Sequence, residues 1–125
     1  MNLEKVFFGF FIVLALTLNV AFVIGDIGNP DHHSIWLLFA AVVVNLIATV
    51  LKLGDRSQTG ALLLATAFVA DLQLLTSALI WTFADSSVAL SAGTMTTIVS
   101  LAYGALVANI VSVTLLVSDT LMAGR

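Results

Sequence analysis

The chain has 125 residues, of which 61% are hydrophobic and only 9% are charged. A soluble domain usually carries about 25% charged residues, because its water-facing surface is polar. This composition excludes a soluble enzyme, and a formal net charge of −3 leaves no basic surface for a nucleic-acid partner. The sequence contains no cysteine, which excludes disulfides and thiolate metal sites. We therefore predict an integral membrane protein that is surrounded by the lipid bilayer.

Four apolar stretches of the chain are long enough to span a bilayer, which takes about 20 residues as a helix. They cover residues 6–24, 35–53, 61–83 and 94–117, and the short breaks between them are rich in glycine, aspartate and serine. Short connections place consecutive helices antiparallel and next to one another. The sequence therefore predicts an all-α fold, an antiparallel bundle of four transmembrane helices that forms a single domain over residues 1–125.

The basic residues all fall on one side of this four-span arrangement: Lys5, Lys52, Arg56 and Arg125. Positively charged residues stay on the cytoplasmic side of a membrane, so both termini and the second loop are expected to face the cytoplasm. Trp36 and Trp81 lie near the outer ends of their predicted spans. Tryptophan at that depth typically forms an aromatic belt at the membrane interface.

The loop after the first helix contains Asp26, Asp31 and the adjacent pair His32 and His33. Neighbouring histidines rarely reach one metal ion well, and a structural zinc site needs four ligands. We therefore predict a solvated turn and no metal site. Together with Asp85 in the third loop, the two aspartates of this loop are expected to concentrate cations at an outer entrance.

The second predicted helix carries a stripe on one face, formed by Ala41, Asn45, Thr49 and Lys52. Asparagine within a span often makes only an interhelical hydrogen bond. Together with the acid of the third helix, Asn45 would instead line a hydrated path. The stripe leads to a cytoplasmic loop with Lys52, Asp55 and Arg56, which we expect to dock a soluble regulatory subunit.

Asp71 lies within a residue or two of the middle of the third predicted helix. An aspartate at this depth costs about 3 kcal/mol on the insertion scale, which nearly cancels what the apolar residues of the helix contribute. The helix would not tolerate this carboxyl facing lipid, so we expect Asp71 to face protein or water. An intramembrane acid is a functional residue by default, and the alternative is a protonated carboxyl that only holds neighbouring helices together.

Gln73 lies on the opposite side of the third helix, because an offset of two residues places it about 200° from Asp71. One helix of a four-helix bundle cannot easily bury two opposed polar faces within a single subunit. We therefore predict that one face meets the helix's own bundle and the other meets a neighbouring copy. This periodicity predicts a homo-oligomer.

The fourth predicted helix carries small residues at every fourth position, namely Ser100, Gly104, Ala108 and Ser112. Such a groove lets helix backbones approach closely in lipid, where the hydrophobic effect does not drive association. The pattern predicts close helix contact, either within the chain or with another copy. Asn109 lies in the inner half of the same helix and is a further candidate for the hydrated path.

Several segments of the sequence have a distinctive pattern: MNLEKVFFGFF at residues 1–11, GDIGNPDHH at 25–33, ATVLKLGDR at 48–56 and VADLQL at 69–74. In these segments the chain resembles a family of small, uncharacterised bacterial four-helix inner-membrane proteins. The resemblance covers most of the chain. It implies a bacterial origin, a location in the inner membrane and no established activity.

Three functions fit these residues. The first is a homo-oligomeric, cation-selective ion channel or channel subunit, with potassium as the expected ion and Asp71, Gln73, Asn45 and Asn109 along its path. The second is a small proton-coupled transporter in which Asp71 gains and releases a proton. The third is a non-transporting scaffold or accessory subunit. The sequence has no phosphate-binding glycine loop, zinc-protease motif or nucleophile motif, so we expect neither an enzyme nor a cofactor.

Overall fold

A computed structural model describes residues 3–55, 57–85 and 91–123 of the chain. This part forms four long helices and one short 3-10 helix: α1 (Leu3–Val23), η1 (Pro30–His32), α2 (Ile35–Lys52), α3 (Gln58–Asp85) and α4 (Ala92–Ala123). Each of these four α-helices is long and apolar enough to cross a membrane. The described part of the chain is therefore an all-helical bundle of four membrane-spanning candidates, as the sequence predicts.

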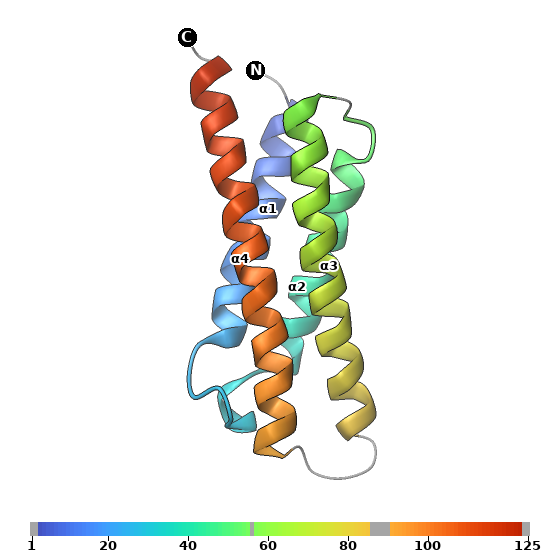
Figure 1. Ribbon diagram of the computed structural model, residues 1–125, viewed down its shortest axis with the longest axis vertical. Helices are drawn as coiled ribbons and strands as arrows, with labels where there is room; N and C mark the ends of the chain where they lie inside the picture. Colours follow the sequence, from blue (N-terminus) through green and yellow to red (C-terminus); the bar gives the residue numbers. More distant parts are fainter. Residues whose placement is uncertain (1–2, 56, 86–90, 124–125) are drawn as a thin grey trace.

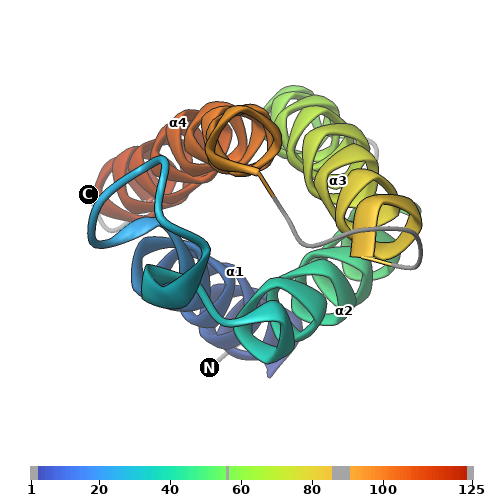
Figure 2. The same ribbon diagram turned by 90° about the horizontal axis from the view of Figure 1, so that it is seen from below.

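The four long helices form a closed ring in chain order, in which consecutive helices pack together and α1 also packs against α4 (Figure 2). Both chain termini and the connection between α2 and α3 lie at one end of the bundle, which we call the terminal end (Figure 1). The helix η1, the end of α3 and the start of α4 lie at the opposite end, called the distal end below. This arrangement brings residues far apart in sequence to the same level of the bundle.

Hydrogen bonds that serine side chains accept from the backbone fix where two of the helices begin. The Ser57 hydroxyl accepts a bond from the Gly60 backbone N–H at 3.0 Å, and the Ser91 hydroxyl accepts one from the Thr94 N–H at 3.0 Å. Such N-caps satisfy backbone donors that have no partner within the helix. At the end of α1, Gly25 takes a φ of +105°, a conformation that glycine adopts without strain.

The two C-terminal helices are longer than the sequence predicts. The helix α3 begins at Gln58 rather than 61, and α4 continues to Ala123 rather than ending at 117. No glycine or proline interrupts the chain between residues 94 and 123 other than Gly104, and a single glycine is tolerated within a helix. The extra turn of α4 carries Asp119, whose carboxylate contacts the Lys5 ammonium at 3.8 Å.

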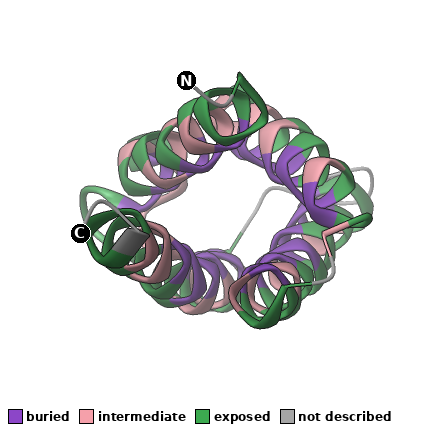
Figure 3. Cartoon of the chain, turned by 90° about the horizontal axis from the view of Figure 1, so that it is seen from above, coloured by how far each residue is buried: buried purple, intermediate pink, exposed green. Residues whose placement is uncertain are grey.

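Buried residues face the inside of the ring and exposed residues face outward (Figure 3). The exposed outer face is rich in large apolar side chains, which is the surface expected for contact with lipid. Trp36 is 79% exposed, whereas Trp81 is only 7% exposed and packs its ring against Phe22 at a centroid distance of 6.1 Å. The predicted aromatic belt is therefore wrong for Trp81, because this residue shares the inward face of α3 with Leu74 and Ala78.

Candidate functional site

The Asp71 carboxyl lies inside the bundle, between α3 and α2. Asp71 is only 5% exposed, and its Oδ2 accepts a hydrogen bond of 2.5 Å from the Thr49 hydroxyl. Thr49 lies on the buried face of α2 together with Asn45, one helical turn away. This contact is therefore a direct polar link between the middle of α3 and the last turn of α2.

The Thr49 hydroxyl has two acceptors and only one proton. Its Oγ1 lies 2.5 Å from Asp71 Oδ2 and 2.9 Å from the Asn45 backbone carbonyl oxygen. A hydroxyl donates one hydrogen bond and accepts others. Both contacts are hydrogen bonds at once only when the carboxyl carries its own proton and donates it to Thr49, which then donates to Asn45. When the carboxyl is ionised, Thr49 donates to Asp71 and the bond to Asn45 is lost.

Four buried residues form what we call the polar layer: Asn45, Thr49, Asp71 and Asn109. Asn109 lies on α4 between Gly104 and Ser112, whose partners on α3, Gln73 and Thr66, lie on either side of Asp71 in the sequence. Both asparagines are fully buried. Within the described part of the chain, Asn45 Oδ1, Asp71 Oδ1 and both polar atoms of the Asn109 side chain are buried without a hydrogen-bond partner. Buried polar groups are nearly always paired, because leaving one unpaired costs about 1–3 kcal/mol. The polar layer therefore has unused capacity to bind a polar species.

Two apolar clusters of the core lie on either side of Asn45 and Asn109, whereas Asp71 lies along α3 between Ala70 and Leu74 of the larger cluster. The larger cluster fills the distal half and includes Val42 and Ala108, whereas the smaller one fills the terminal half and includes Ala48 and Leu63. Along α2, Asn45 lies between Val42 and Ala48. A species held in the layer is thus enclosed by apolar packing on both sides, in the low-dielectric surroundings that strengthen electrostatic interactions.

The opposite flank of α3 packs against α4 of the same chain. The Thr66 and Ser112 hydroxyls are 2.5 Å apart, and the Ser77 hydroxyl donates to the Ile98 carbonyl at 3.0 Å. A Cβ added at Gly104 would overlap the Gln73 amide. The prediction that this face meets a neighbouring copy is therefore wrong, because α3 lies between α2 and α4 and each of its polar faces meets one of them.

The small residues of α4 do not all take part in this contact. Gly104 is half-buried beside Gln73, and Ala108 and Ser112 are buried, whereas Ser100 is exposed. The close approach that the spacing predicts thus occurs within the chain, from Gly104 to Ser112. Gln73 belongs to this α3–α4 contact rather than to the polar layer, although its Oε1 is also buried without a partner.

Asn19 has a structural role that the sequence reasoning did not assign. It is fully buried on α1, and with its amide oriented to suit its neighbours it donates to the Ala102 carbonyl and accepts from the Leu106 N–H, each at 3.0 Å. These two backbone groups belong to one helical turn of α4, so the amide ties α1 to α4. The signal was an asparagine within a predicted span, but its neighbour was not visible in the sequence.

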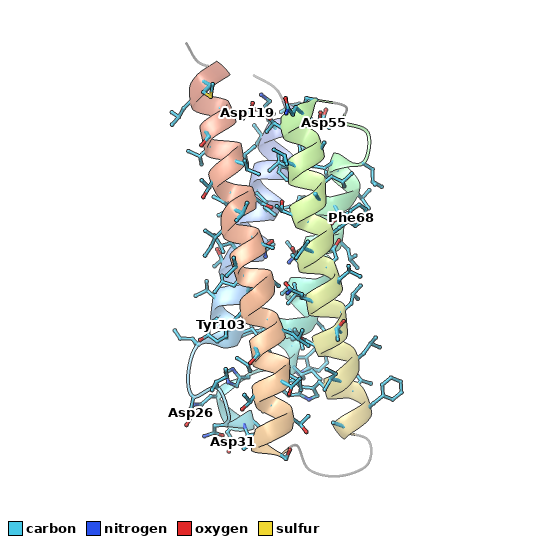
Figure 4. All side chains as sticks on the ribbon, viewed as in Figure 1. Asp26, Asp31, Asp55, Phe68, Tyr103 and Asp119 are labelled. Atoms are coloured by element: carbon cyan, nitrogen blue, oxygen red, sulfur yellow. The ribbon has the colours of Figure 1, made fainter. Side chains whose placement is uncertain are left out.

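A pocket of about 460 Å³ opens at the terminal end of the bundle, between the ends of the helices. Asp55 and Asp119 both lie at this end (Figure 4). The Thr59 hydroxyl donates to Asp119 at 3.3 Å, and Lys5 pairs with the same carboxylate. Sequence reasoning missed Asp119 because it ended the fourth helix two residues earlier. The pocket is lined by Glu4, Lys5, Lys52, Gly54, Asp55, Ser57, Thr59, Gly60, Leu63, Leu116 and Asp119.

Lys52 is part of the bundle rather than of an accessible loop. It is only 3% exposed, and its ammonium lies 3.3 Å from Asp55 Oδ2 and 4.5 Å from the centroid of the Phe8 ring. Lys52 therefore continues the buried face of Asn45 and Thr49, and the docking of a regulatory subunit by Lys52, Asp55 and Arg56 stays a prediction. Arg56 lies outside the described residues.

Asp55 closes the loop between α2 and α3. Its Oδ1 accepts bonds from the Ser57 backbone N–H at 2.9 Å and from the Ser57 hydroxyl at 2.7 Å. The backbone bond from Ser57, followed by the hydroxyl bond, lowers the pKa of the Asp55 carboxyl below its ordinary value. The ionised form of this carboxyl therefore stabilises the turn that leads into α3.

Asp26 and Asp31 are exposed at the distal end, on the loop between α1 and α2 (Figure 4). Asp85 ends α3 at the same end, and its side chain lies outside the described part. The solvated turn predicted for this loop is wrong for His33, which is buried because both of its ring nitrogens face backbone carbonyl oxygens. Among the described residues, no three potential ligands come together as a metal site.

The chain belongs to the family of unknown function DUF6394, whose model matches residues 32–120. The match covers α2, α3 and all but the last three residues of α4, and therefore includes every residue of the polar layer. This finding agrees with the resemblance to an uncharacterised family that the sequence segments indicate. No curated protein and no solved structure matches the chain.

Proposed function

We propose that the protein is a small proton-coupled membrane transporter in which the Asp71 carboxyl gains and releases a proton. The observation that carries this proposal is the Thr49 hydroxyl, which lies between the Asp71 carboxyl and the Asn45 carbonyl with one proton for two contacts. Adding a proton to Asp71 completes the chain of hydrogen bonds, and removing it reverses the direction of the Thr49 bond. The two protonation states therefore favour different arrangements of α2 and α3.

The depth of Asp71 supports the same role. A charged carboxyl at the middle of a membrane is costly, and such residues typically belong to proton relays or ion pathways. The unpaired buried atoms of Asn45 and Asn109 can stabilise a polar species while the carboxyl changes its charge. A site with these two properties is suited to take up a proton and to release it.

The two ends of the bundle differ in a way that suits a transporter. A polar pocket enters the terminal end as far as Leu63 and Leu116, whereas a larger apolar cluster closes the distal half. Transport by alternating access requires a central site that is reached from one side at a time. The basic residues of the sequence favour a cytoplasmic location for the terminal end, and in that orientation this structure would be an inward-facing arrangement.

A channel formed by a ring of copies is less compatible with this geometry. Its lining residues would lie on the outer surface of each bundle, but Asp71 is 5% exposed and is covered by α2 of its own chain. Potassium or another monovalent cation would therefore have to pass through a single bundle. The position of Asp71 favours the carrier over the channel.

A scaffold or accessory subunit is the second candidate function. The bond between Thr49 and Asp71 joins α2 to α3, and this alone gives the carboxyl a purely structural use. In that case the protonation state of Asp71 would have no effect on movement across the membrane. The two candidates differ in whether the purified protein moves protons.

Reconstitution into liposomes with an enclosed pH dye tests the proposal. With small ions and candidate solutes on both sides, we expect an imposed pH gradient to decay faster with the wild-type protein, and Asp71→Asn to reduce this rate at least tenfold. Asp31→Asn removes an exposed carboxyl at the distal end and is the matched control, with a wild-type rate. No proton movement with any of the proteins would favour the scaffold. Cation flux that is independent of the pH gradient would favour a channel.

A further inference from the structure

The His33 imidazole is held between two backbone carbonyl groups at the distal end. Its Nδ1 lies 2.6 Å from the Phe22 carbonyl oxygen, and its Nε2 lies 2.9 Å from the Asp26 carbonyl oxygen. The residue is 5% exposed, and its ring packs against the Phe22 ring at a centroid distance of 5.6 Å. Both ring nitrogens are therefore committed to acceptors that cannot donate.

A neutral imidazole cannot make both of these bonds. It carries one N–H, so its second nitrogen would present a lone pair to a carbonyl oxygen at hydrogen-bond distance. The imidazolium carries two N–H groups and satisfies both oxygens with charge-assisted bonds. The Phe22 carbonyl also belongs to the last turn of α1, where unpaired carbonyls form the negative end of the helix dipole and favour a cation.

We propose that His33 is a second proton-binding site, and that its protonated form clamps the α1–α2 loop onto the C-terminal turn of α1. Loss of the proton breaks one of the two bonds and loosens the loop at Phe22 or at Asp26. Histidine side chains serve as proton-dependent switches of this kind in proteins. The site is independent of Asp71 and of the proposed transport.

The described titratable groups near His33 bond to other partners, and none of them donates a proton to the two carbonyl oxygens that face the His33 ring. The Asp26 carboxyl is turned back into its own loop, where Oδ1 accepts from the Gly28 N–H at 3.2 Å. His32 is exposed and its Nδ1 accepts from the Asp26 N–H at 2.7 Å, while Asp31 is exposed. From α4, the Tyr103 hydroxyl donates to the Val23 carbonyl at 3.5 Å. The described side chains in the distal turns of α2 and α3 include no titratable group.

The direction of the pH effect follows from which form makes more bonds. Acid protonates His33 and tightens the distal end, and alkali releases it. If the distal end faces outward, as the basic residues indicate, the clamp responds to the pH outside the cell. Hydrogen exchange of residues 24–33 reports this local opening directly.

Two measurements on the full chain in micelles test the proposal. In His32→Gln, which leaves His33 as the only histidine, we expect nitrogen NMR of the ring to show both nitrogens protonated at pH 5. Amide protection of residues 24–33, corrected for intrinsic exchange, should fall on the order of tenfold from pH 5 to pH 8. The same fall should persist in His32→Gln and disappear in His33→Gln.

A neutral His33 ring at pH 5, or an equal pH dependence of protection in His33→Gln and the wild type, would overturn the proposal. If His33→Gln does not fold, the ring spectrum of His32→Gln decides the question alone. Neither measurement uses transport, so failure of the clamp is distinguishable from failure of the proposed function.

Discussion

The hydroxyl of Thr49 bridges the Asp71 carboxyl on α3 and the Asn45 carbonyl on α2, at 2.5 Å and 2.9 Å. One hydroxyl proton cannot serve both oxygens, so the state of the bridge depends on whether Asp71 is protonated. At the distal end, two carbonyl oxygens likewise face the His33 ring, which carries only one N–H when it is neutral. In both places the number of available protons decides how firmly neighbouring segments are held together.

The Thr49–Asp71 bond should be measurable as a coupling between the two residues. Thr49→Val removes the donor at nearly the same side-chain volume, and Asp71→Leu removes the acceptor with a larger, apolar side chain. In reversible unfolding in mixed micelles we expect a coupling energy of about 0.6–2 kcal/mol in the double-mutant cycle. Thr76→Val is the matched control, because the exposed Thr76 hydroxyl donates only to the Leu72 carbonyl of its own helix. Strictly additive losses for Thr49 and Asp71 would argue against the bridge.

Asp55 should stabilise the protein in a pH-dependent way. Because the pKa of its carboxyl is lowered in the folded state by the bonds from Ser57, its contribution is present above the ordinary aspartate pKa of about 3.9. The contribution is lost as the pH falls through the lowered folded-state pKa. We expect Asp55→Asn to reduce the free energy of unfolding by about 1 kcal/mol at pH 7.

This difference should vanish in acid, where the wild-type carboxyl is also neutral. Unfolding of both proteins at a series of pH values from neutral to strongly acidic checks the prediction. A difference that stays constant over that series would mean that the charge of Asp55 has no role in the turn.

Gly104 should be required for the packing of Gln73 between α3 and α4. A methyl group at Gly104 overlaps the end of the Gln73 side chain, which must move away from its place. We expect Gly104→Ala to reduce stability by about 1 kcal/mol, and to have little effect when Gln73→Ala is also present. Gly93→Ala is a suitable control because a Cβ there meets nothing closer than 3.9 Å. Equal losses in both backgrounds would contradict this assignment.

The sequence was sufficient to predict the helices but not their neighbours. The composition and the apolar runs predict four spans. The cost of a carboxyl in lipid predicts that Asp71 faces protein or water. The periodicity of α3 correctly separates Asp71 and Gln73 onto two faces, but it does not show that α2 covers one face and α4 the other. That information depends on the ring order of the helices, which only the packing reveals.

The distal loop shows a second kind of limit. Two adjacent histidines have the same local sequence signal, yet His32 is exposed and His33 is buried. The difference arises because Phe22, in the last turn of α1, and Asp26, in the loop that follows it, both direct their carbonyl oxygens toward His33. Gly25 permits this path by its positive φ. A backbone acceptor pair of this kind has no signature in the side-chain sequence.

The most direct test of the central claim is an infrared titration of the Asp71 carboxyl in the reconstituted protein. We predict a carboxylic-acid band in the wild type that weakens as the pH rises, shifts in deuterated water and is missing from Asp71→Asn. In Thr49→Val the band should move, because the carboxyl loses its hydrogen-bond partner. Identical carboxyl bands in the wild type and Asp71→Asn at every pH would show that Asp71 does not exchange a proton within the bundle.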